Sequence, residues 1–167
     1  MPSANLSSGL SPVSTLDVYD EFKNKINIII NGGRSKIGIE STVIDLTGKP
    51  KILRPGIIDS HKIKSFLKID FSKKSSKIKS PGMLRKHYSP GIPVILNKKP
   101  TNIKYAYITF GKNYTNKKNT FNLSKKADLK EAASNLYKTM RVIKKKYHFY
   151  QQILALSLHP QERLLWT

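Results

Sequence analysis

The chain has 167 residues, with 31 Lys and Arg against 10 Asp and Glu, which gives a formal net charge of +21 at pH 7. This length predicts one ordinary domain or two small ones. Without cysteine the chain has neither disulfides nor a thiolate metal site, and no apolar run reaches the roughly 18 residues of a membrane span. The start carries no secretion signal, so we expect a cytoplasmic protein.

The excess of positive charge favours an anionic partner such as RNA, DNA or a nucleotide. Most of the cations are lysines that stand among many Ile and Asn residues, a mixture that an AT-rich genome would encode. A solvated, lysine-coated surface is therefore the simpler interpretation, and binding to nucleic acid stays open as the alternative.

The first predicted element is a helix that begins near Thr15. Ser14 and Asp17 fit a capping pattern, and apolar residues follow at helical spacing. The stretch "NIII", residues 27–30, predicts a short buried strand that the turn signal "NGG" ends.

Two further strands are expected at residues 42–46 and 51–54. The stretch "TGKP" between them favours a tight turn, so the pair predicts a β-hairpin. The next segment, "IIDSHKIKSFLK", predicts a short helix that Asp59 or Ser60 caps. Its inward-facing residues would be Ile63, Phe66 and Leu67.

Residues 70–91 are rich in Lys, Ser, Pro and Gly and predict a linker. A flexible tether has no need of the aromatic and basic cluster "MLRKHY", so we expect this part of the linker to dock. A second α/β unit follows, with strands in "IPVIL", "YAYITF" and "QILALSL". Asp128 and Glu131 resemble a capping box at the start of a long helix. The apolar stripe of this helix, from Leu129 to Tyr147, is interpreted as core.

The hydroxyls and the arginine of the predicted hairpin indicate anion chemistry. Hydroxyls bind phosphate and carboxylate oxygens, and a guanidinium binds phosphate at two points. In a hairpin, Ser41 and Arg54 lie near the same end and can form an anion-binding pair. Alternatively, Ser41 and Thr42 simply begin a strand and Arg54 pairs with Glu40. No common phosphate-loop, dinucleotide, esterase or metalloprotease motif is present, and no residue is assignable as acid, base or nucleophile.

Three motifs in order, "PSANLSSGLSP", "NGGRSKIGIESTVIDLTGKPKILRPG" and "SPGMLRKHYSPGIPV", resemble the YrdC family of threonylcarbamoyl-AMP synthases in its longer form. The resemblance implies an α/β protein in three parts. Residues 1–69 would form the C-terminal half of a YrdC-like domain with a twisted open sheet, residues 70–91 a linker and active-site flap, and residues 92–167 a small, truncated Rossmann-like α/β domain.

The resemblance also implies a nucleotidyltransferase. It would form threonylcarbamoyl-adenylate and pyrophosphate from L-threonine, bicarbonate and ATP, with Mg²⁺ accompanying the ATP. A downstream transfer complex would then modify the adenosine beside the anticodon of tRNA. By motif, the implied ATP-binding residues are Ser3, Ser11, Arg54 and Tyr88, and the implied threonine-binding residue is Ser41. The alternative is a basic module that binds tRNA or double-stranded RNA without catalysis.

The family pattern extends upstream of "PSAN", so this chain resembles an N-terminally truncated fragment or one half of a split gene. Missing strands would leave an open sheet edge and exposed apolar surface. We therefore expect the chain by itself to have little or no synthase activity.

Overall fold

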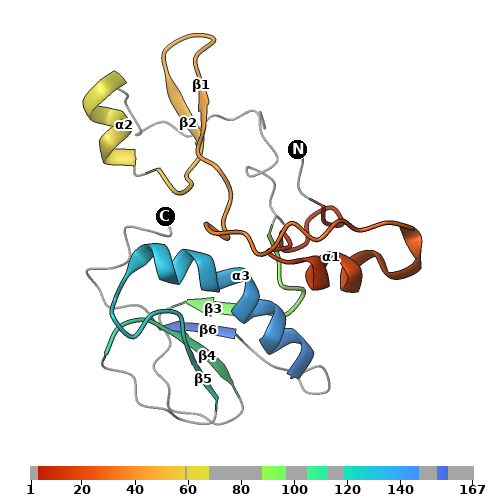
Figure 1. The fold of residues 1–167 in the computed structure, drawn as a ribbon. Helices are drawn as coiled ribbons and strands as arrows, with labels where there is room; N and C mark the ends of the chain where they lie inside the picture. The colour runs from red at the N-terminus through yellow and green to blue at the C-terminus, as the bar shows by residue number, and fades with distance from the viewer. Residues whose placement is uncertain are drawn as a thin grey trace.

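A computed structural model describes residues 4–58, 60–67, 88–96, 105–112, 119–146 and 154–157. The chain is an α/β protein with a two-stranded and a four-stranded sheet (Figure 1). In chain order the elements are α1 Thr15–Phe22, the 3-10 helix η1 Lys23–Lys25, β1 Val43–Asp45, β2 Lys51–Arg54, α2 Ser60–Leu67, β3 Val94–Leu96, β4 Ala106–Thr109, β5 Thr120–Asn122, α3 Leu129–Lys146 and β6 Leu154–Ser157.

The predicted first helix is confirmed as α1. The Ser14 side chain accepts a hydrogen bond from the Asp17 N–H, which satisfies one of the backbone donors that a helix start leaves open. The Asp17 carboxylate in turn accepts the Val13 N–H at 3.0 Å. These two contacts fix the direction in which the chain enters the helix.

The predicted hairpin is also confirmed, because β1 and β2 pair antiparallel. Val43 lies opposite Arg54 and Asp45 opposite Lys51, with an irregularity of register beside Val43. Arg54 is therefore held at the open end of the hairpin, next to the residues that lead into β1.

The C-terminal unit is a parallel sheet in the order β3-β6-β4-β5, with α3 packed on one face (Figure 1). The Asp128 carboxylate accepts the N–H groups of Lys130 (2.7 Å) and Glu131 (3.0 Å), so the predicted cap of the long helix is confirmed. Glu131 does not complete a capping box with Asp128. Its carboxylate instead accepts a hydrogen bond from the Ser124 hydroxyl. The oxygen of that hydroxyl in turn accepts a hydrogen bond from the Asp128 N–H.

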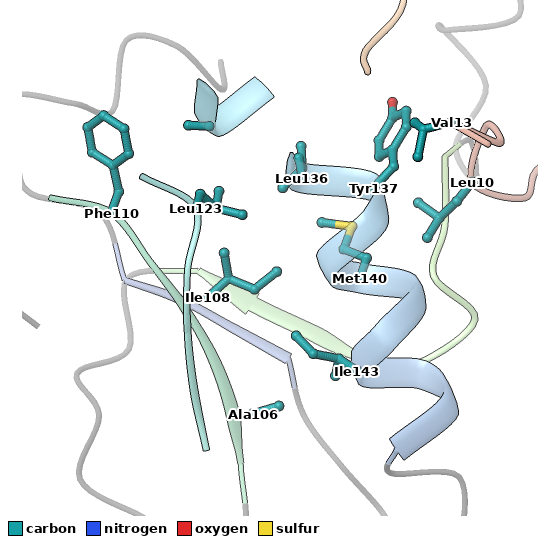
Figure 2. Packing of buried hydrophobic residues seen from close by; sticks show 11 residues of the cluster. Leu10, Val13, Ala106, Ile108, Phe110, Leu123, Leu136, Tyr137, Met140 and Ile143 are labelled. Atoms are coloured by element: carbon teal, nitrogen blue, oxygen red, sulfur yellow. The ribbon is translucent and has the colours of Figure 1, made fainter. Parts of the chain in front are cut away.

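The main core lies between α3 and the parallel sheet, and two residues from the N-terminal part join it. Figure 2 shows Leu10 and Val13 beside the α3 residues Tyr137 and Met140. The buried residues of α3 are Ala132, Ala133, Leu136, Tyr137, Met140 and Ile143. Residues from both sequence units thus contribute to one core.

Three expectations are wrong. Residues 27–30 form no strand, since no described strand pairs with them and Ile28 and Ile30 are 81% and 88% exposed. Of the three residues predicted to face inward from α2, Ile63 is buried, while Phe66 and Leu67 face solvent. Leu129, the first residue of the apolar stripe, is also exposed. The short strand β5, by contrast, has no counterpart among the expected elements.

Most of the predicted linker and the residues Ser3, Asp59, His87 and Tyr147 lie outside the described residues. No helix within the described ranges has the length and apolar character needed to cross a membrane.

Candidate anion-binding site

The open end of the hairpin holds a cluster of polar side chains centred on Arg54. Its Nε donates to the Ser41 carbonyl oxygen at 2.9 Å, and its Nη2 donates to the Ser41 hydroxyl at 3.0 Å. Its Nη1 donates to the Tyr88 hydroxyl at 2.7 Å. These three bonds use three of the five N–H donors of the guanidinium. Of the two alternatives left open by the sequence, this arrangement supports the pairing of Ser41 with Arg54.

Gly56 fixes the backbone on which Ser41 stands. A Cβ at this position would lie 2.3 Å from the Thr42 nitrogen, 2.5 Å from the Ser41 carbonyl carbon and 2.6 Å from the Glu40 carbonyl oxygen. Real Cβ atoms essentially never approach so closely, so the chain needs a glycine here. The Thr42 hydroxyl adds a second tie, because it donates to the Ile58 carbonyl oxygen at 3.1 Å.

Ser11 reaches the same cluster through Glu40. Its hydroxyl donates to the Glu40 carboxylate, and Glu40 directly precedes Ser41. Ser11 is buried at 8% exposure. A small hollow of about 140 Å³ lies beside this bond. Its lining residues are Ser11, Pro12, Val13, Ser35, Gly38, Ile39 and Glu40.

Tyr88, which lies 34 positions after Arg54 in the sequence, contributes its hydroxyl to the cluster from a strained backbone. Its φ of 53° lies in the left-handed region, which costs a residue with a side chain about 1–2 kcal/mol. The next residue is anchored, because the Ser89 N–H donates to the Ser8 carbonyl oxygen at 2.9 Å. The Tyr88 ring stacks on the Tyr137 ring of α3, with centroids 6.0 Å apart and planes at 25°.

The surroundings keep both tyrosine hydroxyls protonated. Burial raises the pKa of Tyr88 above its ordinary value of 10, and the Glu40 carboxylate raises it further, while Arg54 lowers it in part. Burial is also the main reason why the pKa of Tyr137 is well above 10, with additions from Glu40 and Tyr88. At neutral pH the cluster therefore presents a cation and neutral hydroxyls beside one carboxylate.

The structure brings together four of the five predicted site residues: Ser11, Ser41, Arg54 and Tyr88. The fifth, Ser3, lies outside the described residues. The sequence does not mark Tyr137 as a site residue, because its spacing predicts only a place in the core of a helix. It is indeed buried, at 7% exposure, but it also contacts the site. Its helical spacing gave no signal for this second contact.

The described residues include no group of three or more His, Cys, Asp or Glu that could hold a metal ion. Glu40, the carboxylate in the cluster, accepts the Ser11 hydroxyl. The chemistry that this arrangement offers is the recognition of an anion by a guanidinium and hydroxyls.

The two sheets and the cluster at the end of the hairpin define the class of the protein: it is an α/β protein with a candidate anion-binding site. Residues 57–166 match the family model of the threonylcarbamoyl-AMP synthase C-terminal domain. Residues 1–56 match the Sua5, YciO and YrdC model, which is described as telomere recombination. The chain therefore belongs to the Sua5/YrdC family, as the motifs predicted.

Individual relatives agree with this family. The chain is 42% identical over 106 residues to the threonylcarbamoyl-AMP synthase of Pyrococcus abyssi, an alignment that covers 59% of this chain and 31% of the relative. It is 39% identical over 107 residues to that of Schizosaccharomyces pombe, covering 57% and 26% respectively.

The fold agrees as well. The crystal structure of P. abyssi Sua5 complexed with L-threonine superposes with a TM-score of 0.75 at 30% identity, and the match covers 98% of this chain. It covers 56% of the P. abyssi chain. The chain thus spans about half of that structure, and its alignments span about a third or less of the two curated relatives.

Proposed function

We propose that this chain provides the part of a threonylcarbamoyl-AMP synthase that holds the reacting phosphate. The reaction would join L-threonine, bicarbonate and ATP to threonylcarbamoyl-adenylate and release pyrophosphate. A downstream complex would pass the threonylcarbamoyl group to the tRNA adenosine next to the anticodon. The observation that carries this proposal is the hydrogen-bonded cluster of Ser41, Arg54 and Tyr88 in a chain of this family.

The proposed residue roles follow the chemistry of the side chains. Arg54 would bind the nucleotide phosphate and neutralise the charge that develops at phosphorus. Ser41 would contact the threonine, and Ser3 and Ser11 would hold the nucleotide. Tyr88 would cover the site and keep water from the mixed anhydride.

No covalent protein nucleophile is needed for this reaction. The threonine amine and bicarbonate would form a carbamate with release of water. An oxygen of that carbamate would then attack the α-phosphorus of ATP, and the bond from that phosphorus to the pyrophosphate oxygen would break. Positioning and charge neutralisation can supply much of the rate. Mg²⁺ would come with the phosphates of ATP, which ordinarily carry it.

Titration calorimetry of the purified chain with ATP, with and without L-threonine, tests this function. Arg54→Ala should weaken ATP binding by tenfold or more, because the guanidinium is replaced by a methyl group. The matched control is Lys51→Ala, which removes the same charge from the other end of β2. Equal ATP affinity of the parent chain and Arg54→Ala, or no ATP binding by the parent chain, would contradict the proposal.

The net charge of +21 supports a second candidate, a basic module that binds tRNA or double-stranded RNA without catalysis. Its binding would fall steeply with salt and would not respond to ATP. In that case Lys51→Ala and Arg54→Ala should weaken RNA binding to a similar small extent, since each removes one charge of many.

A further inference from the structure

The C-terminal unit contacts the candidate site through one face of α3. Ser134, Tyr137 and Arg141 follow each other at steps of three and four residues, so they lie on the same side of the helix. Tyr137 is the one that contacts a predicted site residue directly, through its stacking on Tyr88. Figure 2 shows its ring at the end of the core nearest to Val13.

The site half of the molecule is tied to this face at two further points. Arg34 donates from Nη2 to the Ser134 carbonyl oxygen at 2.8 Å. The backbone at Gly38 also packs closely on Ser134, since a Cβ at Gly38 would lie 2.7 Å from the Ser134 Cα. Arg141, only 13% exposed, donates to the Leu10 carbonyl oxygen and pairs with Glu21 at 3.1 Å. The helix therefore has a fixed position relative to the site.

Tyr88 needs such a support. Its backbone has a positive φ of 53°, which persists only where the surroundings over-determine it. Its hydroxyl must also meet Arg54 at 2.7 Å. The Ser89 anchor fixes the chain after Tyr88. Stacking on the face of Tyr137 adds a contact that orients the plane of the Tyr88 ring.

We propose that Tyr137 is a positioning residue, whose buried ring holds Tyr88 in the orientation that places its hydroxyl on Arg54. The inference rests on the proposed function in one respect: if Arg54 binds ATP, then ATP affinity depends on Tyr137, a residue of the C-terminal unit. The ring carries the effect, and the Tyr137 hydroxyl is not required. The C-terminal unit is thus part of the site and not merely an attached module.

The test compares ATP affinity by calorimetry among variants of the full chain. Tyr137→Phe keeps the ring and should bind ATP within twofold of the parent chain. Tyr137→Leu and the more conservative Tyr137→Met lose the aromatic face and should bind fivefold or more weakly. Ile143→Val is the matched core control, since Ile143 is fully buried further along the same helix. It should bind as the parent chain does.

A double variant separates positioning from a general loss of packing. In a Tyr88→Ala background, Tyr137→Met should have no additional effect on ATP affinity, because the ring that it supports is gone. Independent, additive losses would overturn the inference, and so would parent-like affinity of Tyr137→Met alone.

A readout without ligand distinguishes failure of this inference from failure of the proposed function. Hydrogen exchange of the Ser89 amide, which is bonded to Ser8, should speed up in Tyr137→Met and stay unchanged in Ile143→Val. If the parent chain binds no ATP, the proposed function is wrong and the exchange rates still decide the positioning role. Unchanged exchange in Tyr137→Met would overturn that role.

Discussion

Replacement of Gly56 by alanine should disrupt the site without removing any of its functional groups. The added Cβ would stand 2.3 Å from the Thr42 nitrogen, whereas ordinary contact begins at 3.4 Å. The two backbone segments must therefore separate by about 1.1 Å. A shift of that size lengthens the bonds from Arg54 to Ser41, now 2.9 and 3.0 Å, beyond the range of a hydrogen bond.

Such overpacking costs about 1–3 kcal/mol, against which the stiffer unfolded chain returns about 0.4–1 kcal/mol. At about 2–4 °C per kcal/mol for a chain of this size, we expect Gly56→Ala to lower Tm by several degrees. Gly48→Ala in the turn of the same hairpin is the control, because a Cβ there meets nothing within 4 Å. Thermal unfolding by circular dichroism measures both. Equal Tm values for Gly56→Ala and Gly48→Ala would refute the close-approach argument.

The remaining predictions concern charge, protonation and capping. Arg54→Lys keeps the charge but loses the planar fork, so ATP affinity measured by calorimetry should fall about threefold to tenfold; parent-like affinity would show that charge alone suffices. Because folding raises the pKa of Tyr137 above 10, its stabilising contribution is complete below pH 10 and is lost at higher pH. Urea unfolding of Tyr137→Phe should therefore depend less on pH above 10 than that of the parent chain, and identical profiles would contradict this. Asp128→Ala removes the cap of α3 and should lower the unfolding free energy by about 1 kcal/mol in urea titrations, whereas Asp128→Asn should cost little.

The parts of the site that local sequence rules govern were predictable. The "TGKP" turn between two apolar runs is sufficient for a hairpin, and a hairpin of this length returns Arg54 to the level of Ser41. The motif resemblance added Ser11 and Tyr88, which no local rule connects to the hairpin. Their roles as ligands of ATP remain predictions.

The parts that depend on distant packing were not predictable. Whether "NIII" becomes a strand depends on a pairing partner, which the local sequence cannot supply, so Ile28 and Ile30 are exposed. The contact of Tyr137 with Tyr88 joins residues 49 positions apart, and helical periodicity places Tyr137 in the core without saying what lies above its ring. Phe66 illustrates the same limit: its helical spacing predicts burial, but no part of the chain that the structure describes covers its side chain.

The bond between Arg141 and Leu10 spans 131 positions of the chain. A ribosome that adds about 5–20 residues per second needs roughly 7–26 s to make the second partner after the first. During that interval Leu10 and Val13 lack α3, against which they pack in the folded chain, so their side chains stay accessible to chaperones and proteases. The packing of this stretch is therefore completed only after the segment that carries Arg141 has been made.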